Sequence, residues 1–353
     1  MNKKKENTKH YYGSLIFMII LIILTFFLLF KDNSLSALRP ILKTADPIYL
    51  LIGLFFMIVF ISCEALNIKM IMKSFDIRLS FKKCMNYAFI GFYFSAITPS
   101  ASGGQPVQVY YMKRDHINVS HSSLTLLIVT VIFQIVMLLY GLFMYFFEYE
   151  FIMANVRGIK WLLLFGVVIN LILIAFIFAA IFSKKIITKF ILSIIKFLAK
   201  IRVVKNIDST RENVLQQIDE YSNGARFIKK NPLLLIKVAL VTIIQKTAVY
   251  SVPFFIYQSF HLSGHSLMQV LAIQALLTIA VSSLPLPGAV GVTETSFMTL
   301  FKIFFSSGLI LPAMLLSRGI SFYAMLIISG IVTLFVHIKS GKNVCKIPEK
   351  KVS

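Results

Sequence analysis

The sequence is short of the residues on which disulfide-rich domains, zinc sites and many enzyme active sites depend. Its 353 residues include only three cysteines, and none belongs to a C-x-x-C pair, so neither a disulfide framework nor a zinc site is indicated. The six histidines form no metal-binding pattern, and no Ser/His/Asp or Cys/His set stands out. The nucleotide-binding motif GxxxxGK[ST] does not occur. We therefore predict no catalytic residues, no metal and no cofactor in this chain.

Acidic residues are also scarce, with 14 Asp and Glu against 36 Lys and Arg, which gives a net charge of +22. In a soluble protein such an excess suggests nucleic acid as a partner. Here the basic residues border apolar runs, and the sequence has no nucleic-acid-binding motif. We therefore predict no nucleic-acid partner and attribute the charge to the positive-inside rule of membrane proteins.

Apolar residues are what the sequence has in excess. They make up 58% of the chain, whereas soluble domains have about 45–50%. A membrane-spanning helix needs roughly 20 apolar residues, and several runs reach that length. We predict an all-α integral membrane protein with six full transmembrane helices, at about 14–30, 48–72, 121–147, 160–182, 233–258 and 310–338. The first run is longer than a signal-peptide core and no small-x-small cleavage site follows it, so we expect a retained anchor.

The basic residues predict the orientation of these spans. If the N-terminus is cytoplasmic, the segments on that side hold 27 of the 36 Lys and Arg, the opposite segments hold five, and four lie within apolar segments. We therefore predict a multi-pass protein of the cell (plasma) membrane with a basic cytoplasmic N-terminus (1–13) and a basic cytoplasmic tail (339–353).

The whole chain, 1–353, reads as one membrane domain, because no segment has the size and composition of a soluble catalytic domain. The longest connection, 183–231, contains IITKFILSIIKFLAKI, in which lysines recur among apolar residues. Two interpretations stay open for this cytoplasmic loop. It lies along the inner leaflet, where anionic lipids attract it, or it forms a helix that packs on the other spans.

Two further apolar regions, 82–115 and 266–305, are interrupted by TPSASGG and SSLPLPGAVG. Pro99 in the first and Pro285 and Pro287 in the second prevent a regular helix. The limbs of about 12–18 residues suit re-entrant half-helices, which under the predicted topology enter from opposite sides, as in inverted-repeat transporters. The alternative is a pair of continuous spans kinked at proline, whose small residues allow close packing.

If the hairpins are re-entrant, the returning half-helices begin near Gly104 and Gly291. Helix N-termini carry unpaired N–H groups and a partial positive charge, and so favour an anion. A phospholipid phosphate is the natural anion for a protein that is almost entirely membrane. The predicted head-group site at the two breaks comprises Ser100, Ser102, Gly103, Gly104, Gln105, Gly288 and Gly291.

Four charged residues within apolar segments complete the predicted site: Glu64, Lys246, Glu294 and Arg318. A charge at the centre of a membrane helix costs roughly 2.5–3.5 kcal/mol on insertion scales, so each requires a partner or a water-filled cavity. We expect Lys246 and Arg318 to neutralise a phosphate, and Glu294 and Glu64 to face a cationic head group or a coupling proton. Structural alternatives remain, because Glu294 would also compensate a helix dipole, and Glu64 would also pair with Lys69 or reach interfacial water.

TPSASGGQPVQVYYMKR (98–114) and SLPLPGAVGVTE (283–294) resemble the two signature segments of the lysylphosphatidylglycerol synthase transmembrane-region family, the flippase-like domain of multiple peptide resistance factor and its stand-alone relatives. The resemblance implies translocation of phosphatidylglycerol-type or lysyl-modified lipids between leaflets, and resistance to cationic antimicrobial peptides. It departs at Gln105, where the family often has an acid, and at Thr293, where it often has arginine. Glu294 and Arg318 match positions where the family tends to place charge.

The leading hypothesis is thus a lipid translocase with membrane phospholipids as partners. One alternative is a phosphatidylglycerol lysyltransferase, alone or with a separate synthase subunit, although the chain stops after IPEKKVS and the family's lysine-transferring domain is not expected in it. Another is a non-catalytic partner of cell-envelope glycolipid machinery. A homo-oligomer is also compatible with the sequence.

Overall fold

The computed structural model describes residues 42–155, 160–183, 188, 218, 220–226, 230–282, 284 and 289–344. These residues form helices and the turns between them, without a strand, which confirms the predicted all-α class for this part of the chain. The predicted span at 14–30, both basic termini except residues 339–344, and Gly288 lie outside the described residues.

Four helical segments are long and apolar enough to cross a membrane. Two are single helices, α3 (Pro47–Ser74) and α6 (Val119–Phe147). The third is α11 (Pro232–Tyr250) continued by α12 (Val252–Ser259). The fourth is α15 (Ile310–Arg318), a π-helical turn η4 (Gly319–Ala324) and α16 (Met325–Val344). These four segments coincide with the predicted spans at 48–72, 121–147, 233–258 and 310–338. A further predicted span, at 160–182, coincides with α8 (Lys160–Phe182), whose apolar part is shorter than that of the four segments.

Polar caps define where the long helices begin. Asp46 precedes Pro47 at the first position of α3, and its side chain accepts a hydrogen bond from the N–H of Ile48 at 2.9 Å. Asn118 caps α6 by accepting from the N–H of Ser120 at 3.0 Å. These caps allow long, almost uniformly apolar sequences to start at defined residues.

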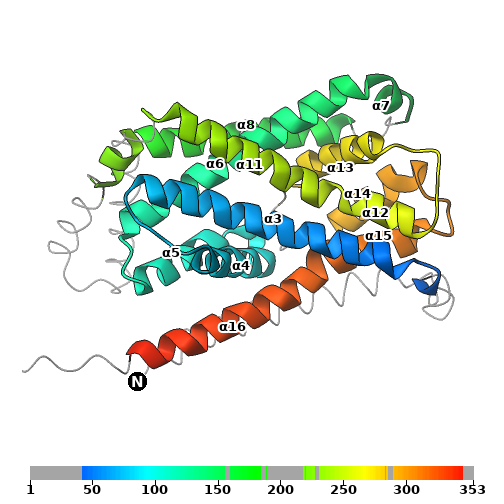
Figure 1. The fold of residues 1–353 in the computed structure, drawn as a ribbon. Coiled ribbons are helices and arrows are strands. Elements are labelled where there is room, and N and C mark those ends of the chain that lie inside the picture. Colours follow the sequence, from blue (N-terminus) through cyan, green and yellow to red (C-terminus); the bar gives the residue numbers. More distant parts are fainter. Residues whose placement is uncertain are drawn as a thin grey trace, which may run out of the picture.

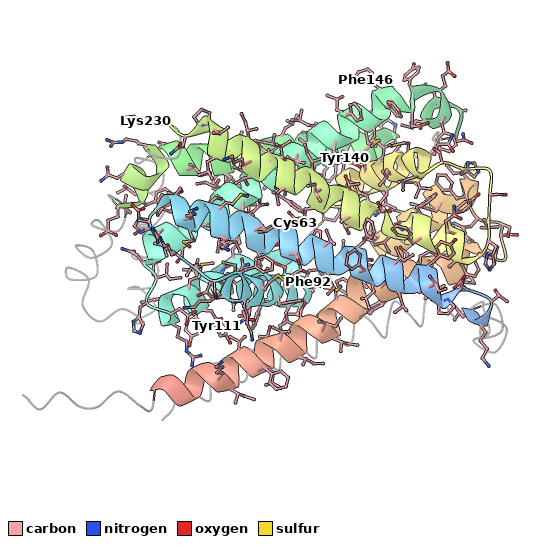
Figure 2. The ribbon with its side chains drawn as sticks, in the orientation of Figure 1. Cys63, Phe92, Tyr111, Tyr140, Phe146 and Lys230 are labelled. Atoms are coloured by element: carbon pink, nitrogen blue, oxygen red, sulfur yellow. The ribbon has the colours of Figure 1, made fainter. Side chains whose placement is uncertain are left out.

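Helix α3 lies at the centre of the packing, against α11, α4 and α12, as Figure 1 shows. Asp46 N–H donates to the carbonyl of Ser259 at 2.8 Å, so the start of α3 meets the end of α12. We call this the Pro47 end of the bundle and the opposite one the Ser74 end. Figure 2 shows Phe146 near the first, and Lys230 and Tyr111 near the second.

Large apolar side chains cover the outside of the bundle. Trp161 is 83% exposed, and Phe146 and Phe335 are each 68% exposed. A soluble protein rarely exposes so much contiguous apolar surface, and a lipid-facing one does. Inside, one large apolar cluster surrounds α3 and α6 and a second surrounds α13 (Leu267–Val281).

Part of the predicted cytoplasmic loop belongs to this interior. Tyr221 and Ala225 are buried in the cluster around α3 and α6, and Ile218 is buried as well. These buried residues lie outside the amphipathic stretch to which the two interpretations apply, so both interpretations stay open. The amphipathic stretch 186–201 lies outside the described residues, apart from Thr188.

Candidate functional site

The first interrupted region is a helical hairpin. It consists of α4 (Phe81–Ile97), a short turn η1 (Pro99–Ala101) and α5 (Gly104–Arg114). The two helices pack antiparallel, since Gln108 Nε2 donates to the carbonyl of Tyr87 at 3.0 Å and Tyr87 hydroxyl donates to Asp115. Lys83 and Asp115 form an ion pair of 3.2 Å where the two limbs end together. This geometry excludes a kinked continuous span here.

Glycine allows the two limbs of this hairpin to approach. A Cβ atom on Gly104 would lie 2.0 Å from Ser95 Oγ and 2.8 Å from the carbonyl oxygen of Gly91. At the tip, Thr98 Oγ1 donates to the carbonyl of Phe94 at 2.6 Å and accepts from the N–H of Gly103 at 2.9 Å. The tip therefore depends on residues without bulk and on one hydroxyl that ties both limbs.

The second interrupted region is also a hairpin, formed by α13 and by α14 (Val292–Leu300) with the turn η3 (Phe301–Ile303). His265, just before α13, packs its ring on that of Phe304, just after η3, with centroids 4.9 Å apart. His265 also packs on Tyr257, in α12 near the Pro47 end. The first hairpin opens at the Ser74 end, beside the last turn of α3, so the two hairpins open at opposite ends of the bundle (Figure 1).

The tips of the hairpins meet inside the bundle. Val290, at the second break, is buried in one cluster with Ala96 and Ile97, at the end of α4. Phe322 of η4 belongs to the same cluster. Each break also holds an alanine in the left-handed region, Ala101 with φ 54° and Ala289 with φ 49°, where glycine is normally favoured. Such strained residues are concentrated at functional sites.

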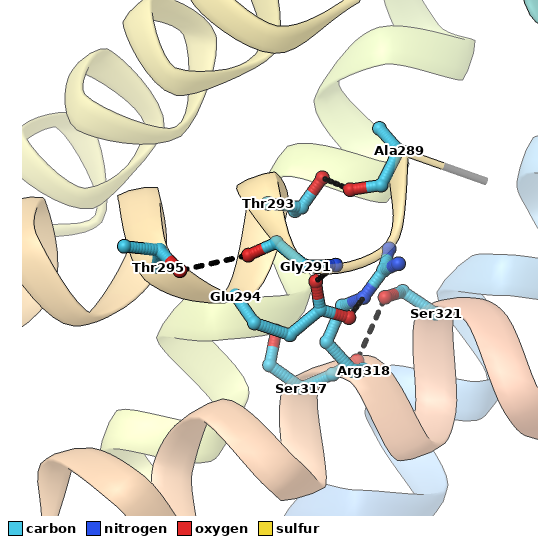
Figure 3. Close-up of polar contacts among 8 residues, drawn as sticks. All are labelled: Ala289, Gly291, Thr293, Glu294, Thr295, Ser317, Arg318 and Ser321. Atoms are coloured by element: carbon cyan, nitrogen blue, oxygen red, sulfur yellow. Dashed lines mark hydrogen bonds and ion pairs between the residues drawn. The ribbon is translucent and has the colours of Figure 1, made fainter. Parts of the chain in front are cut away.

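A buried ion pair lies beside this junction. Glu294 Oε1 accepts from Arg318 Nε at 2.8 Å, and its Oε2 accepts from the N–H of Gly291 at 2.7 Å (Figure 3). The side chains are 1% and 12% exposed, and the guanidinium of Arg318 stacks 4.5 Å from the ring centre of Phe322. The pair thus links α14 to the end of α15, where the π-helical turn begins. Such turns occur often at functional sites.

The sequence reasons for this local geometry are clear. Gly291 has φ 88°, which a residue with a side chain adopts only at a cost, and it begins α14. Glu294 is the third residue of the helix, where a carboxylate reaches back to the first N–H groups and complements the helix dipole. The expected dipole-compensating role of Glu294 is therefore present, together with an arginine partner that the sequence did not specify.

The other two predicted charges lie away from this pair, at a level nearer the middle of α3, and have separate contacts. Glu64 Oε1 accepts from Gln108 Nε2 at 3.3 Å, and Gln105 donates to Thr130. The ammonium of Lys246, 2% exposed, lies 3.3 Å from the ring centre of Phe133. Asn67 of α3 donates a hydrogen bond to Thr242 of α11, which runs antiparallel to α3. This contact places Gln245 of α11 level with Glu64 of α3. Lys246 is the residue after Gln245.

Lys246 and Arg318 lie at different levels of the bundle. Gly53 lies against Ile320, so Arg318 is level with the first turns of α3, whereas Glu64 lies about 11 residues further along. At 1.5 Å per residue this amounts to roughly 17 Å. The expectation that both cations neutralise one phosphate stays a prediction.

The predicted site residues are otherwise distributed as follows. Gly103 and Gly104 open α5 at the junction, Ser102 ends η1, and the side chain of Ser100 is not among those that the structure describes. Sequence reasoning missed Gln108, Phe322 and the interior amides Asn67 and Gln245. The amides carried a signal, because a polar residue inside an apolar run of about 20 is expensive unless it has a role.

This arrangement defines a class of protein: a helical membrane protein with two opposed hairpins and an ion pair at their junction. The chain belongs to the family described as the lysylphosphatidylglycerol synthase TM region, whose sequence pattern matches residues 14–329 and thereby confirms the predicted resemblance.

Two relatives are themselves described only as membrane proteins. One is the UPF0104 membrane protein PH1989 of Pyrococcus horikoshii, 25% identical over 314 residues, which cover 83% of this chain and 89% of the relative. The other is a UPF0104 membrane protein of Archaeoglobus fulgidus, 22% identical over 321 residues, which cover 89% of this chain and 94% of the relative.

Proposed function

We propose that this protein moves phospholipid head groups between the leaflets of the cell membrane. The observation that carries the proposal is the meeting of two hairpin tips, from opposite ends of the bundle, beside the Glu294–Arg318 pair. Opposed broken helices with a polar site at mid-depth are the arrangement of inverted-repeat transporters, in which one repeat rocks against the other around a fixed site. The two hairpins are the corresponding elements of such a repeat.

The site suits a phosphate because of how Arg318 is held. A guanidinium binds carboxylate and phosphate through the same planar donor geometry. Glu294 supplies the resident anion, and an incoming phosphate takes over part of its contact with Arg318. The exchange keeps the arginine compensated in a low-dielectric interior, where an unpaired charge costs several kcal/mol. A cationic head group would in turn engage the carboxylate that the phosphate releases.

The proposed exchange involves neighbouring residues of two elements (Figure 3). Gly291 and Glu294 belong to the tip of the second hairpin, whereas Ser317, Arg318 and Ser321 belong to the fourth long segment. Breaking the Glu294–Arg318 contact therefore separates two elements and opens the junction. Closing it after the head group leaves restores the starting state.

The orientation follows from charge. The Ser74 end carries Lys73, Lys83, Lys113 and Arg114 beside the open end of the first hairpin. By the positive-inside rule this end faces the cytoplasm, with both termini on that side. The substrate class that we assign is phosphatidylglycerol or its aminoacylated forms, and resistance to cationic peptides would follow from a changed outer-leaflet charge.

The test is leaflet exchange of a fluorescent phosphatidylglycerol analogue in liposomes that contain the full chain. Arg318→Ala should abolish exchange, and Glu294→Gln should slow it, because the resident anion is lost while the donor geometry of the site remains. Lys302→Ala is the matched control: it removes an exposed cation from η3 of the same hairpin and should leave exchange unchanged.

Equal exchange in wild type, Arg318→Ala and Glu294→Gln would overturn the proposal. Lipid extracts from cells that express the chain alone provide a separate check. Lysyl-modified phosphatidylglycerol in those extracts would favour the lysyltransferase alternative instead.

A further inference from the structure

A group of buried polar side chains lies between α3 and α11, apart from the junction. Asn67 Nδ2 donates to Thr242 Oγ1 at 3.0 Å, and the two residues are 0% and 1% exposed. This bond fixes how the helices are aligned, and the contact between Asp46 and Ser259 shows that they run antiparallel. Residues three positions apart share one helix face. Glu64 on α3 and Gln245 on α11 are therefore level with each other.

We call Glu64, Asn67, Thr242 and Gln245 the central polar layer. Its amides are incompletely bonded among the residues that the structure describes. Asn67 Oδ1 has no hydrogen-bond partner there, and neither Oε1 nor Nε2 of Gln245 has one, although Gln245 is only 1% exposed. A buried polar group without a partner costs about 1–3 kcal/mol, and native proteins hold few of them. Two such amides at the same depth of a membrane helix pair point to a ligand.

The layer has one negative charge. Glu64 accepts a hydrogen bond from Gln108 Nε2 at 3.3 Å and forms no ion pair within the described part of the chain. Thr242 Oγ1 accepts from Asn67 and donates to the carbonyl of Val238 at 2.8 Å, which leaves one lone pair on the hydroxyl oxygen. Carboxylate, amide and hydroxyl oxygens are what hard cations take as ligands.

We propose that the central polar layer binds a monovalent alkali cation of the Na⁺ class. A single carboxylate balances a single positive charge, whereas a divalent ion would leave one charge uncompensated in the interior. A proton on Glu64 would neutralise the carboxylate but would leave Asn67 Oδ1 and Gln245 Oε1 without partners. One cation engages all of these oxygens together.

Lys246 sets the strength of this site. It follows Gln245 on α11 but points about 100° away around the helix. Its ammonium lies 3.3 Å from the ring centre of Phe133 and 5.6 Å from that of Tyr250, which stabilise it by cation–π contact. Its charge repels a cation in the layer, so replacing it with a neutral residue should tighten binding.

The experiment measures thermal unfolding of the full chain in liposomes of neutral phosphatidylcholine, with NaCl or choline chloride at one ionic strength. Na⁺ should raise the melting temperature in a concentration-dependent manner, because a ligand of the native state stabilises it by mass action. Gln245→Met, which removes the oxygen at similar volume, should weaken the apparent Na⁺ affinity about tenfold.

Two further variants complete the design. Lys246→Met should strengthen the Na⁺ affinity, and Gln245→Glu, which keeps an oxygen and adds a charge, should strengthen it as well. Gln274→Met on α13 is the matched control. It removes the same chemical group from a position outside the layer, where Oε1 of the half-buried Gln274 is itself buried and has no partner in the described residues, and it should leave the Na⁺ response unchanged.

Identical melting curves of the wild type in Na⁺ and in choline would overturn the inference. An equal loss of apparent Na⁺ affinity in Gln245→Met and Gln274→Met would also overturn it. If Gln245→Met does not fold, the comparison of Gln245→Glu with wild type decides the question, because Na⁺ should raise the melting temperature of Gln245→Glu at lower concentration than that of wild type. The measurement contains no anionic lipid, so its failure leaves the phospholipid proposal intact. Loss of lipid exchange alone would leave the cation site intact.

Discussion

In both hairpins the chain turns back inside a bundle of membrane helices, but the two hairpins are stabilised by different interactions. The first is closed by close packing: a Cβ atom on Gly104 would overlap Gly91 and Ser95, and Gln108 donates a hydrogen bond to the backbone of the opposite limb. The second is closed by charge, because the carboxylate of Glu294 holds both the first N–H of its own helix and Arg318 of another. We infer that the first hairpin is a fixed framework and the second is the element that opens.

The largest effect is expected at the ion pair of the second hairpin. Arg318→Ala leaves Glu294, 1% exposed, without its counter-charge. Breaking one partner of a buried pair costs about 3–5 kcal/mol. The double variant Glu294→Gln/Arg318→Met should recover most of that loss, since no unpaired charge remains. Thermal unfolding in detergent measures both, and a double variant no more stable than Arg318→Ala would show that charge does not close this hairpin.

The first hairpin should fail through steric overlap instead. Gly104→Ala places a Cβ 2.8 Å from a backbone oxygen, which cannot move without moving α4. We expect a loss of about 1–3 kcal/mol, as for overpacked cores. Gly308→Ala is the matched control, since nothing lies within 4 Å of its Cβ. If the two alanine variants unfold at the same temperature, the hairpin is not held by close packing.

The hydroxyl at the first tip should contribute less. Thr98→Val keeps the shape but removes the acceptor for the N–H of Gly103 and the donor to Phe94. Loss of a cap-like hydrogen bond costs roughly 1 kcal/mol. The melting temperature of Thr98→Val, compared with that of Thr295→Val on the exposed face of α14, isolates the contribution of the tip.

The smallest effect is expected at the open end of the first hairpin. Lys83 and Asp115 form an ion pair with side chains 38% and 30% exposed. Exposed pairs contribute about 0–1 kcal/mol and are screened by salt. Lys83→Met should therefore lower stability slightly at low ionic strength and not measurably at high ionic strength. A salt-independent loss would mean that the lysine acts through packing.

The positions of the long helices could be predicted from the sequence, because a helix that crosses lipid requires a long apolar run. The segments around α3, α6, α11–α12 and α15–α16 were predicted within a few residues, and the breaks at Pro99 and before Gly291 were placed correctly. The membrane orientation inferred from the pattern of charges stays a prediction. The count of six spans and the inverted repeat stay predictions, since 14–30 lies outside the described residues.

The site was predicted residue by residue but not as groups. Glu294 and Arg318 were both candidates, yet nothing in their spacing of 24 residues showed that they pair. Lys246 was assigned to the same phosphate as Arg318, and the structure separates them by about three turns of α3. The distance between two such residues is set by how the apolar faces of the helices pack. The identities of apolar side chains say little about which neighbouring helix each of them contacts.

By itself the sequence determined that this chain is a helical membrane protein, where its helices break and which charges must be accommodated inside. Those features follow from local backbone chemistry and from the cost of polar groups in hydrocarbon. Only the tertiary structure decided that the tips of the hairpins meet, that Glu294 holds Arg318, and that Glu64 shares its level with Gln245. Those features depend on how helices align across the bundle, which is set by the fit of many side chains at once.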